Sequence, residues 1–148
     1  MSQPNEQAKT TTILVVESDA EIGSLLLKAL SQKTSYQVVL LTHSLQALQV
    51  ARRIKPDLFI LNYHLPEING VELYDRLHAI KELKHVPAIM VATDFPEEEV
   101  KQRKIVGLKK PFDMNELLDA ISKALNWLAY SDLLRSSSLP GCYSVRGY

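Results

Sequence analysis

Residues 56–70 read Pro56-Asp57-Leu58-Phe59-Ile60-Leu61-Asn62-Tyr63-His64-Leu65-Pro66-Glu67-Ile68-Asn69-Gly70. The apolar run Leu58 to Leu61 predicts a strand. Pro56 ends the preceding helix, because proline disfavours helical geometry at the residue before it. Asn62 follows at the C-terminal end of this strand, the end at which functional sites lie in open α/β sheets.

Strand-like and helix-like segments alternate on both sides of this stretch. Strands separated by single helices must be parallel, with right-handed crossovers. The sequence therefore predicts an α/β fold, a doubly wound five-stranded parallel sheet with helices on both faces. Besides Leu58 to Leu61, the predicted strands are Thr12–Val16, Tyr36–Leu41, Val86–Val91 and Ile105–Leu108.

Caps and apolar spacing predict where the helices lie. Ser18 or Asp19 is expected to cap the first helix, which should bury Ile22, and Ser44 the second. The third is expected over Gly70–Leu83. Asp94 and Glu97 have the spacing of a capping box for a short helix, Pro96–Lys104. The last helix should bury one stripe, formed by Met114, Leu117, Leu118, Ile121, Leu125 and Leu128.

Composition fits an ordinary globular domain. The chain has 148 residues, of which 46% are hydrophobic and 23% charged, with 17 basic and 17 acidic residues. A net charge of zero gives no reason to expect nucleic acid or an anionic membrane as partner. One cysteine, Cys142, excludes an internal disulfide and suits a reducing compartment. No apolar stretch has the length of a membrane span, so we expect a cytoplasmic protein.

The two ends differ from the middle of the chain. Residues 1–11 are polar and are expected to form a disordered tail. Residues 12–128 are expected to form the domain. Residues 129–148 are predicted to extend the last helix and then to form a flexible tail, which leaves no room for a helix-turn-helix output domain. Leu133 and Leu134 are candidate contact residues.

Three motifs, in order on this α/β alternation, carry a family resemblance. Ile13 to Glu17 is similar to the first strand and acidic cluster of response-regulator receiver domains. Leu65 to Leu73 is similar to their loop after the phosphorylation site, and Lys110-Pro111-Phe112 to the end of their fifth strand, where the Lys-Pro peptide is commonly cis. The resemblance covers about residues 12–128. It implies the flavodoxin-like strand order 2-1-3-4-5 and a role in two-component signalling.

The resemblance also assigns site positions, and several hold unusual residues. The phosphate-accepting aspartate is replaced by Asn62, whose amide oxygen is a poor nucleophile. The first acidic position is Glu17, but the second is Ser18. The hydroxyl position is Ala92, while the lysine, Lys110, is kept. The sequence is thus predicted to be a degenerate pseudo-receiver and not an enzyme.

Weak or absent Mg²⁺ binding follows from the same positions. Magnesium is held through carboxylates and waters, and this cleft offers essentially Glu17, opposed by Lys110. Asp19 is a weaker candidate ligand, because its position favours the start of a helix. We therefore expect no cofactor and a resting charge pair between Glu17 and Lys110.

Other polar residues have plainer interpretations. His43, His78 and His85 are expected on the surface. His64 is expected to be exposed without a function, with a gating or contact role for its side chain as the alternative. Gly107 lies where the resemblance implies an aromatic switch residue on the fifth strand. With Ala92, this removes both members of the hydroxyl–aromatic pair.

Three functional hypotheses remain open. The first is a phosphorylation-independent interaction module that works by contact with another protein. Its partner would be a histidine kinase or a separate output protein, or a second copy of the chain. The second is a conventional receiver that accepts phosphate. The third is a sensor that binds a small ligand in the uncharged cleft around Asn62, Ser18 and Ala92.

Overall fold

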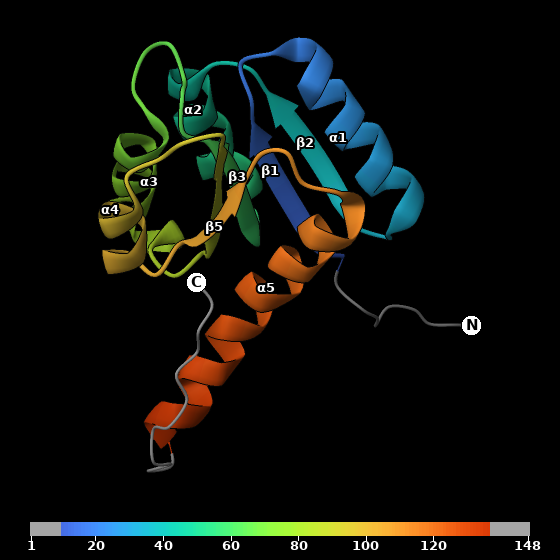
Figure 1. Ribbon diagram of the computed structural model, residues 1–148. Helices are drawn as coiled ribbons and strands as arrows, with labels where there is room; N and C mark the ends of the chain where they lie inside the picture. The colour runs from blue at the N-terminus through green and yellow to red at the C-terminus, as the bar shows by residue number, and fades with distance from the viewer. Residues whose placement is uncertain (1–9, 137–148) are drawn as a thin grey trace, which may run out of the picture.

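A computed structural model describes residues 10–136, with side chains described through Asn126. Its five strands form one parallel sheet in the order β2-β1-β3-β4-β5 (Figure 1), which confirms the predicted fold and strand order. The elements are β1 (Thr12–Val16), α1 (Ala20–Lys33), β2 (Gln37–Leu41), α2 (Ser44–Ile54), β3 (Leu58–Asn62), α3 (Gly70–His78), the short 3₁₀ helix η2 (Lys81–Leu83), β4 (Ala88–Ala92), α4 (Glu97–Gln102), β5 (Val106–Lys109) and α5 (Met114–Ser136).

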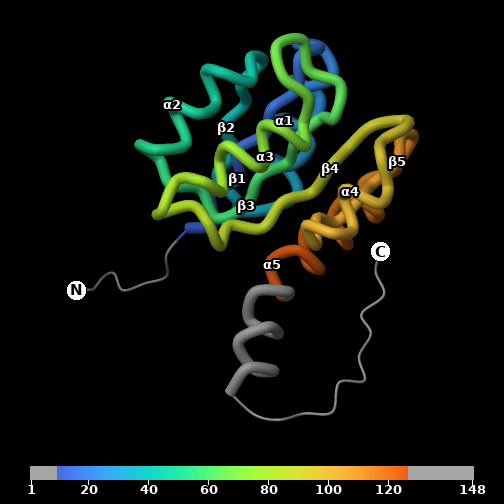
Figure 2. Tube along the Cα trace, turned by 90° about the vertical axis from the view of Figure 1, so that its left-hand side faces the viewer, coloured from blue at the N-terminus to red at the C-terminus, as the bar shows by residue number. Residues whose placement is uncertain are grey.

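Helices cover both faces of the sheet, as the tube view from the side shows (Figure 2). Alternate residues of each strand point to opposite faces. Leu14, Phe59 and Met90 belong to the core under α2, α3 and α4. Ile13 and Ile60 belong to the core under α1 and α5. The three central strands are thus buried on both faces, which explains their continuous apolar sequences.

Most predicted element ends lie within two residues of those observed, and the third helix differs most. The predicted helix Gly70–Leu83 ends at His78 and is followed by η2. Asn69 accepts a hydrogen bond from Glu72 N and so caps the start of α3. The apolar residue Leu83 is buried although it lies outside α3. Periodicity alone therefore did not separate the helix from the 3₁₀ turn after it.

Helix caps were predicted with mixed success. Of the two residues predicted as possible caps of α1, Ser18 and Asp19, it is Asp19 that caps the helix by accepting hydrogen bonds from Glu21 N and Ile22 N. The prediction for Ser44 was wrong, because His43 occupies the N-cap position without a side-chain hydrogen bond. The capping box of Asp94 and Glu97 was also wrong. Pro96 precedes α4 without a side-chain cap.

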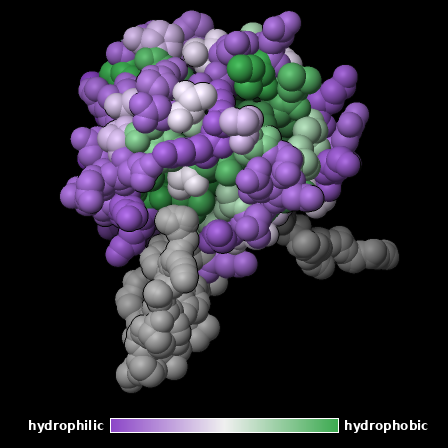
Figure 3. All heavy atoms as spheres, viewed as in Figure 1, coloured by the Kyte–Doolittle hydropathy of each residue, from purple (hydrophilic) through white to green (hydrophobic). Residues whose placement is uncertain are grey.

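The outer side of α1 is partly apolar. Ile22 is 37% exposed and Leu25 is 67% exposed, so the predicted burial of Ile22 was wrong. The inward positions are Gly23 and Leu30. A Cβ on Gly23 would lie 2.7 Å from Leu40 Cδ1, so the helix packs closely on β2 here. Figure 3 shows apolar surface where α1 meets β2, among hydrophilic side chains.

The last helix extends past the predicted domain end. α5 runs from Met114 to Ser136, and Leu117 and Ile121 are fully buried against the sheet. The side chains of Leu128, Leu133 and Leu134 lie outside the described residues, as do the predicted tails over 1–9 and 137–148. Within the described part of the chain, no helix has the length and apolar character needed to span a membrane.

Candidate functional site

Glu17, Asn62 and Lys110 meet at the C-terminal edge of the sheet. Glu17 follows β1, Asn62 is the last residue of β3, and Lys110 follows β5. Asn62 Nδ2 lies 2.9 Å from each carboxylate oxygen of Glu17. Lys110 Nζ lies 3.5 Å from Glu17 Oε1, which confirms the predicted pair. Parallel strands bring these three side chains, distant in sequence, into one cluster.

The orientation of the Asn62 amide follows from its neighbours. A carboxylate only accepts hydrogen bonds, so the side of the amide that faces Glu17 must be the NH₂ group. The opposite side accepts a hydrogen bond from the backbone N–H of His64, at 3.0 Å from Oδ1. Asn62 is 8% exposed. Both ends of its side chain are therefore engaged within the protein.

Glu17 is a buried acid that receives several donors. It is 3% exposed, and besides Asn62 and Lys110 it accepts a hydrogen bond from Asp19 N at 3.0 Å. A buried carboxylate is tolerated only when it is paired and hydrogen-bonded. Asn62 Nδ2, Asp19 N and Lys110 Nζ meet that requirement together.

The other predicted site positions lie around this cluster. Ser18 is exposed, directly before the N-cap of α1. Ala92 ends β4 and is 1% exposed, and its carbonyl accepts a hydrogen bond from Lys110 N at 2.9 Å. The peptide bond between Lys110 and Pro111 is cis, as the resemblance implied.

His64 makes a side-chain contact, the alternative that the sequence left open for it. Its ring is exposed, as predicted, but Nε2 lies 3.1 Å from the carbonyl oxygen of Asp94. A carbonyl only accepts, so Nε2 carries the proton. His64 thus connects the loop after β3 to the loop after β4. The position of His64, two residues after a strand end, gave no sequence signal for its partner, Asp94.

Glu67 in the loop after β3 performs the role predicted for Ser44. Its Oε1 accepts from Ser44 Oγ at 3.2 Å and is 3.4 Å from Leu45 N. The carboxylate therefore lies at the N-terminus of α2, where the helix dipole favours negative charge. His43 supplies no side-chain cap. The start of α2 is stabilised instead by Glu67, a residue from another loop.

His78 is half-buried, so its predicted surface position was wrong. Its ring lies 4.0 Å from that of Tyr74, centroid to centroid, and its Nε2 donates to Val86 O at 2.7 Å. Burial lowers the pKa of His78 below its ordinary value of 6.5, and the hydrogen bond opposes this shift. Burial likewise raises the pKa of Tyr74 to about 12. His43 and His85 are exposed, as predicted.

Comparison with known proteins places this geometry in a family. Residues 13–122 match the response regulator receiver domain. The chain belongs to that family. This receiver domain is 30% identical over 120 residues to the polar-differentiation response regulator DivK of Brucella ovis, an alignment that covers 78% of the chain and 97% of DivK.

Solved structures agree with the fold of this receiver domain. The chemotaxis protein CheY4 of Vibrio cholerae superposes with a TM-score of 0.73 at 23% identity, over 79% of this chain and 100% of CheY4. The signal receiver domain of an HD domain-containing protein from Pseudomonas fluorescens gives a TM-score of 0.74 at 26% identity, over 89% and 98%.

One similar structure contains a metal. The receiver domain of a sensor histidine kinase from Pseudomonas aeruginosa holds a magnesium ion in its active-site cleft; it has a TM-score of 0.69 and 23% identity, over 80% of this chain and 99% of that one. In this chain the Glu17 carboxylate contacts the amide nitrogen of Asn62, the backbone N–H of Asp19 and the ammonium group of Lys110. The Asn62 amide turns its nitrogen toward Glu17, and the Asp19 carboxylate caps α1. A magnesium ion requires several oxygen ligands. The nitrogen groups that surround Glu17 do not provide them, so this arrangement does not fit the ion.

Proposed function

We propose that this receiver domain is a signalling module that acts by protein contact and accepts no phosphoryl group at Asn62. The observation that carries the proposal is the hydrogen-bonded pair of Asn62 and Glu17, 2.9 Å apart. An amide at this position cannot supply the ionised oxygen that carboxylate nucleophiles use. Its nitrogen also faces the acid that would otherwise help to hold a metal.

Magnesium independence is part of the same proposal. The Asn62 NH₂ group provides Glu17 with partial positive charge, and Lys110 provides full charge at 3.5 Å. Together they satisfy the buried carboxylate in the way that a cation would. Charge-assisted hydrogen bonds of this kind are stronger than neutral ones. The site is therefore expected to be complete as it stands, in a protein without enzymatic activity.

The partner is expected to be another protein of a two-component pathway in the cytoplasm. Receiver domains of this family signal through histidine kinases and other proteins. The balanced charge of the chain supports a protein partner over nucleic acid or a membrane surface. A small ligand in the cleft receives less support, because both ends of the Asn62 side chain are engaged and Ala92 is buried.

Phosphoryl transfer gives a direct test. The purified chain is incubated with acetyl phosphate and Mg²⁺ and followed by intact-mass spectrometry, and no phosphoryl adduct should form. A triple variant, Ser18→Asp with Asn62→Asp and Ala92→Thr, is the positive control and should take up label. A hydroxylamine-sensitive adduct on the unaltered chain would overturn the proposal.

A further inference from the structure

Charged side chains are distributed unequally between the two ends of the parallel strands. A helix that connects two parallel strands runs back along the sheet, so it begins at the C-terminal edge and ends at the N-terminal edge. Exposed acids gather at the C-terminal edge, and the set called the acidic edge comprises Asp19, Glu21, Glu67, Asp94, Glu98 and Glu116. Exposed bases gather at the N-terminal edge, and the set called the basic edge comprises Arg52, Arg53, Lys55, Lys81, Lys84 and Lys104. The chain thus has two oppositely charged surfaces although its net charge is zero.

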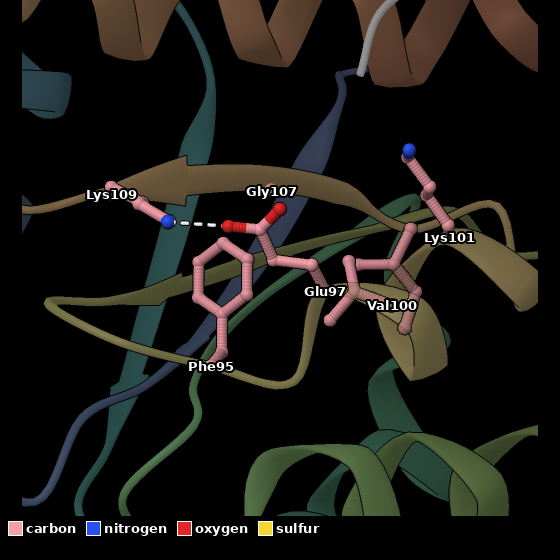
Figure 4. A pocket seen from close by; sticks show the side chains of 7 residues that line it. Phe95, Glu97, Val100, Lys101, Gly107 and Lys109 are labelled. Atoms are coloured by element: carbon pink, nitrogen blue, oxygen red, sulfur yellow. Dashed lines mark hydrogen bonds and ion pairs between the residues drawn. The ribbon is translucent and has the colours of Figure 1, made fainter.

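Charges of the opposite sign do not cancel this separation. Lys109 and Lys110 follow each other beside the acidic edge, but each contacts an acid outside that set. Lys109 pairs with Glu97 at the pocket between α4 and β5 (Figure 4). Lys110 pairs with the buried Glu17. In the loops that precede β3, β4 and β5, Glu82 is the exposed acid. Each edge therefore keeps an excess of its own sign.

Two lysines of the basic edge occupy backbone positions that favour glycine. Lys55 follows α2 with a φ of 46°, and Lys104 follows the C-cap of α4 with a φ of 59°. Side chains are strained at such left-handed positions, and helices commonly place glycine there. The helix dipole favours basic residues near helix ends, which accounts for Arg52 and Arg53 in the last turn of α2. A lysine at a strained position points to a use for the charge itself.

We propose that the basic edge of one copy of this chain docks on the acidic edge of a second copy, in a head-to-tail arrangement. The isoelectric point is about 6.9, so two copies do not repel each other overall at neutral pH. Strands β1 to β4 each have five residues, which separates the edges by about 16 Å at 3.3 Å per residue. That is about twice the Debye length of about 8 Å at physiological salt, so each edge acts as a separate surface.

The contact joins two different surfaces, so it is heterologous and each added copy leaves one edge of each kind open. It involves charges on both edges and holds whether or not Asn62 accepts phosphate. Association should therefore continue beyond a dimer as the protein concentration rises. It should also weaken with salt, because the attraction is between exposed charges.

Sedimentation velocity of the full chain over a range of concentrations tests this. The average mass should rise above 16.7 kDa with concentration at low salt and return to that of the monomer in about 1 M NaCl, where the Debye length is about 3 Å. Monomers at every concentration in low salt would overturn the proposal. Retention of such monomers on heparin would then assign the basic edge to a polyanionic ligand instead.

The basic-edge variant is Lys55→Gly with Lys84→Glu and Lys104→Gly. Glycine suits both left-handed positions, so thermal unfolding should show no loss of stability. Self-association should weaken by about tenfold or more, because like charges then meet at the interface. The control is Lys28→Glu with Lys123→Glu, at exposed positions in the middle of α1 and α5, which lowers the net charge by the same amount. An equal loss in the control would show that net charge alone governs association and would overturn the proposal.

A mixing experiment tests the direction of the contact. The acidic-edge variant, Glu21→Lys with Glu98→Lys, retains its basic edge and should be monomeric alone. Mixed with the basic-edge variant it should associate again, since the mixture contains one unaltered edge of each kind. The complex should stop near the mass of a dimer, because no further unaltered edge is open. A mixture that stays monomeric, or that forms larger species as readily as the original chain does, would refute head-to-tail docking.

Discussion

The amide nitrogen of Asn62 lies 2.9 Å from both carboxylate oxygens of Glu17. This contact joins β3 to the end of β1 at the centre of the site. It explains how a 3% exposed acid is accommodated. It also makes the chain sensitive to a change of a single atom type at Asn62.

Asn62→Asp should destabilise the protein at neutral pH. The variant replaces a donor by a second carboxylate within hydrogen-bond distance of Glu17, and losing the partner of a buried charged group costs about 1–3 kcal/mol. Chemical denaturation at pH 7 measures the loss. Two adjacent carboxylates disfavour each other's ionisation, so one of them takes up a proton more easily than an isolated carboxylate would. The loss of stability should therefore shrink as the pH falls toward about 4.

Asn69→Asp is the matched control for that change. Asn69 caps α3, where aspartate is as good an N-cap as asparagine. The same chemical substitution should therefore alter the free energy of unfolding by less than about 0.5 kcal/mol. A stable Asn62→Asp variant with no pH-dependent deficit would contradict the assigned role of the amide.

Magnesium should leave the melting temperature of the unaltered chain within about 1 °C, because stabilisation by a ligand requires free ligand well above its dissociation constant. Differential scanning fluorimetry with increasing MgCl₂ measures this. The double variant Ser18→Asp with Asn62→Asp restores two carboxylates beside Glu17 and should gain several degrees. A comparable gain by the unaltered chain, abolished by Glu17→Gln, would show that the site binds the ion.

His78 should make the protein less stable at acidic pH than at neutral pH. Burial lowers the pKa of His78 in the folded protein, so the unfolded chain takes up a proton first as the pH falls below about 6.5. Stability is therefore full above that pH, declines below it, and levels off once the pH is below the folded pKa.

His78→Gln should remove this part of the pH profile, and His85→Gln, at an exposed position, should retain it. The free energy of unfolding, measured by urea denaturation between pH 5 and 8, distinguishes the two. Parallel profiles for the original chain and His78→Gln would exclude the assignment.

Gly70 and Gly23 should respond very differently to alanine. A Cβ on Gly70 would lie 2.6 Å from the carbonyl oxygen of Asn62 and 2.9 Å from Tyr63 Cα, both backbone atoms that cannot move aside. We expect a loss of about 3 kcal/mol or more, the upper part of the range for overpacking. On Gly23 the neighbour is the end of the Leu40 side chain, which can turn, and alanine favours the helix by about 1 kcal/mol.

Gly23→Ala should therefore be close to neutral. Thermal unfolding of both variants provides the comparison. A Gly70→Ala variant as stable as Gly23→Ala would mean that the close approach of α3 to the end of β3 is not required.

The sheet could be predicted because its signals are local. Runs such as Thr12–Val16 and Leu58–Leu61 are short and apolar and are separated by helical patterns, and buried parallel strands need nothing more. The pairing of Glu17 and Lys110 could also be predicted, since both residues follow strands that end at the same edge of the sheet. The cap of α1 could be narrowed to Ser18 or Asp19 from their positions alone.

Several of the errors share a physical cause, since each of these depended on a partner far away in sequence. Ser44 does not cap α2, and its hydroxyl donates a hydrogen bond to Glu67 in the loop after β3 instead. Glu97 forms no capping box and pairs with Lys109 instead. The contact of His64 with Asp94 likewise depends on how two loops lie. That Asn62 takes the place of a phosphate acceptor remains a prediction from the resemblance.

The loop after β3 is held at two separate points, by Glu67 at the start of α2 and by His64 at the loop after β4. Such a loop loses most of its conformational freedom when the chain folds. A protein that binds this edge would then meet a pre-organised surface and lose little additional entropy on association. Binding should resemble the docking of two rigid bodies, with little backbone movement between the free and bound forms.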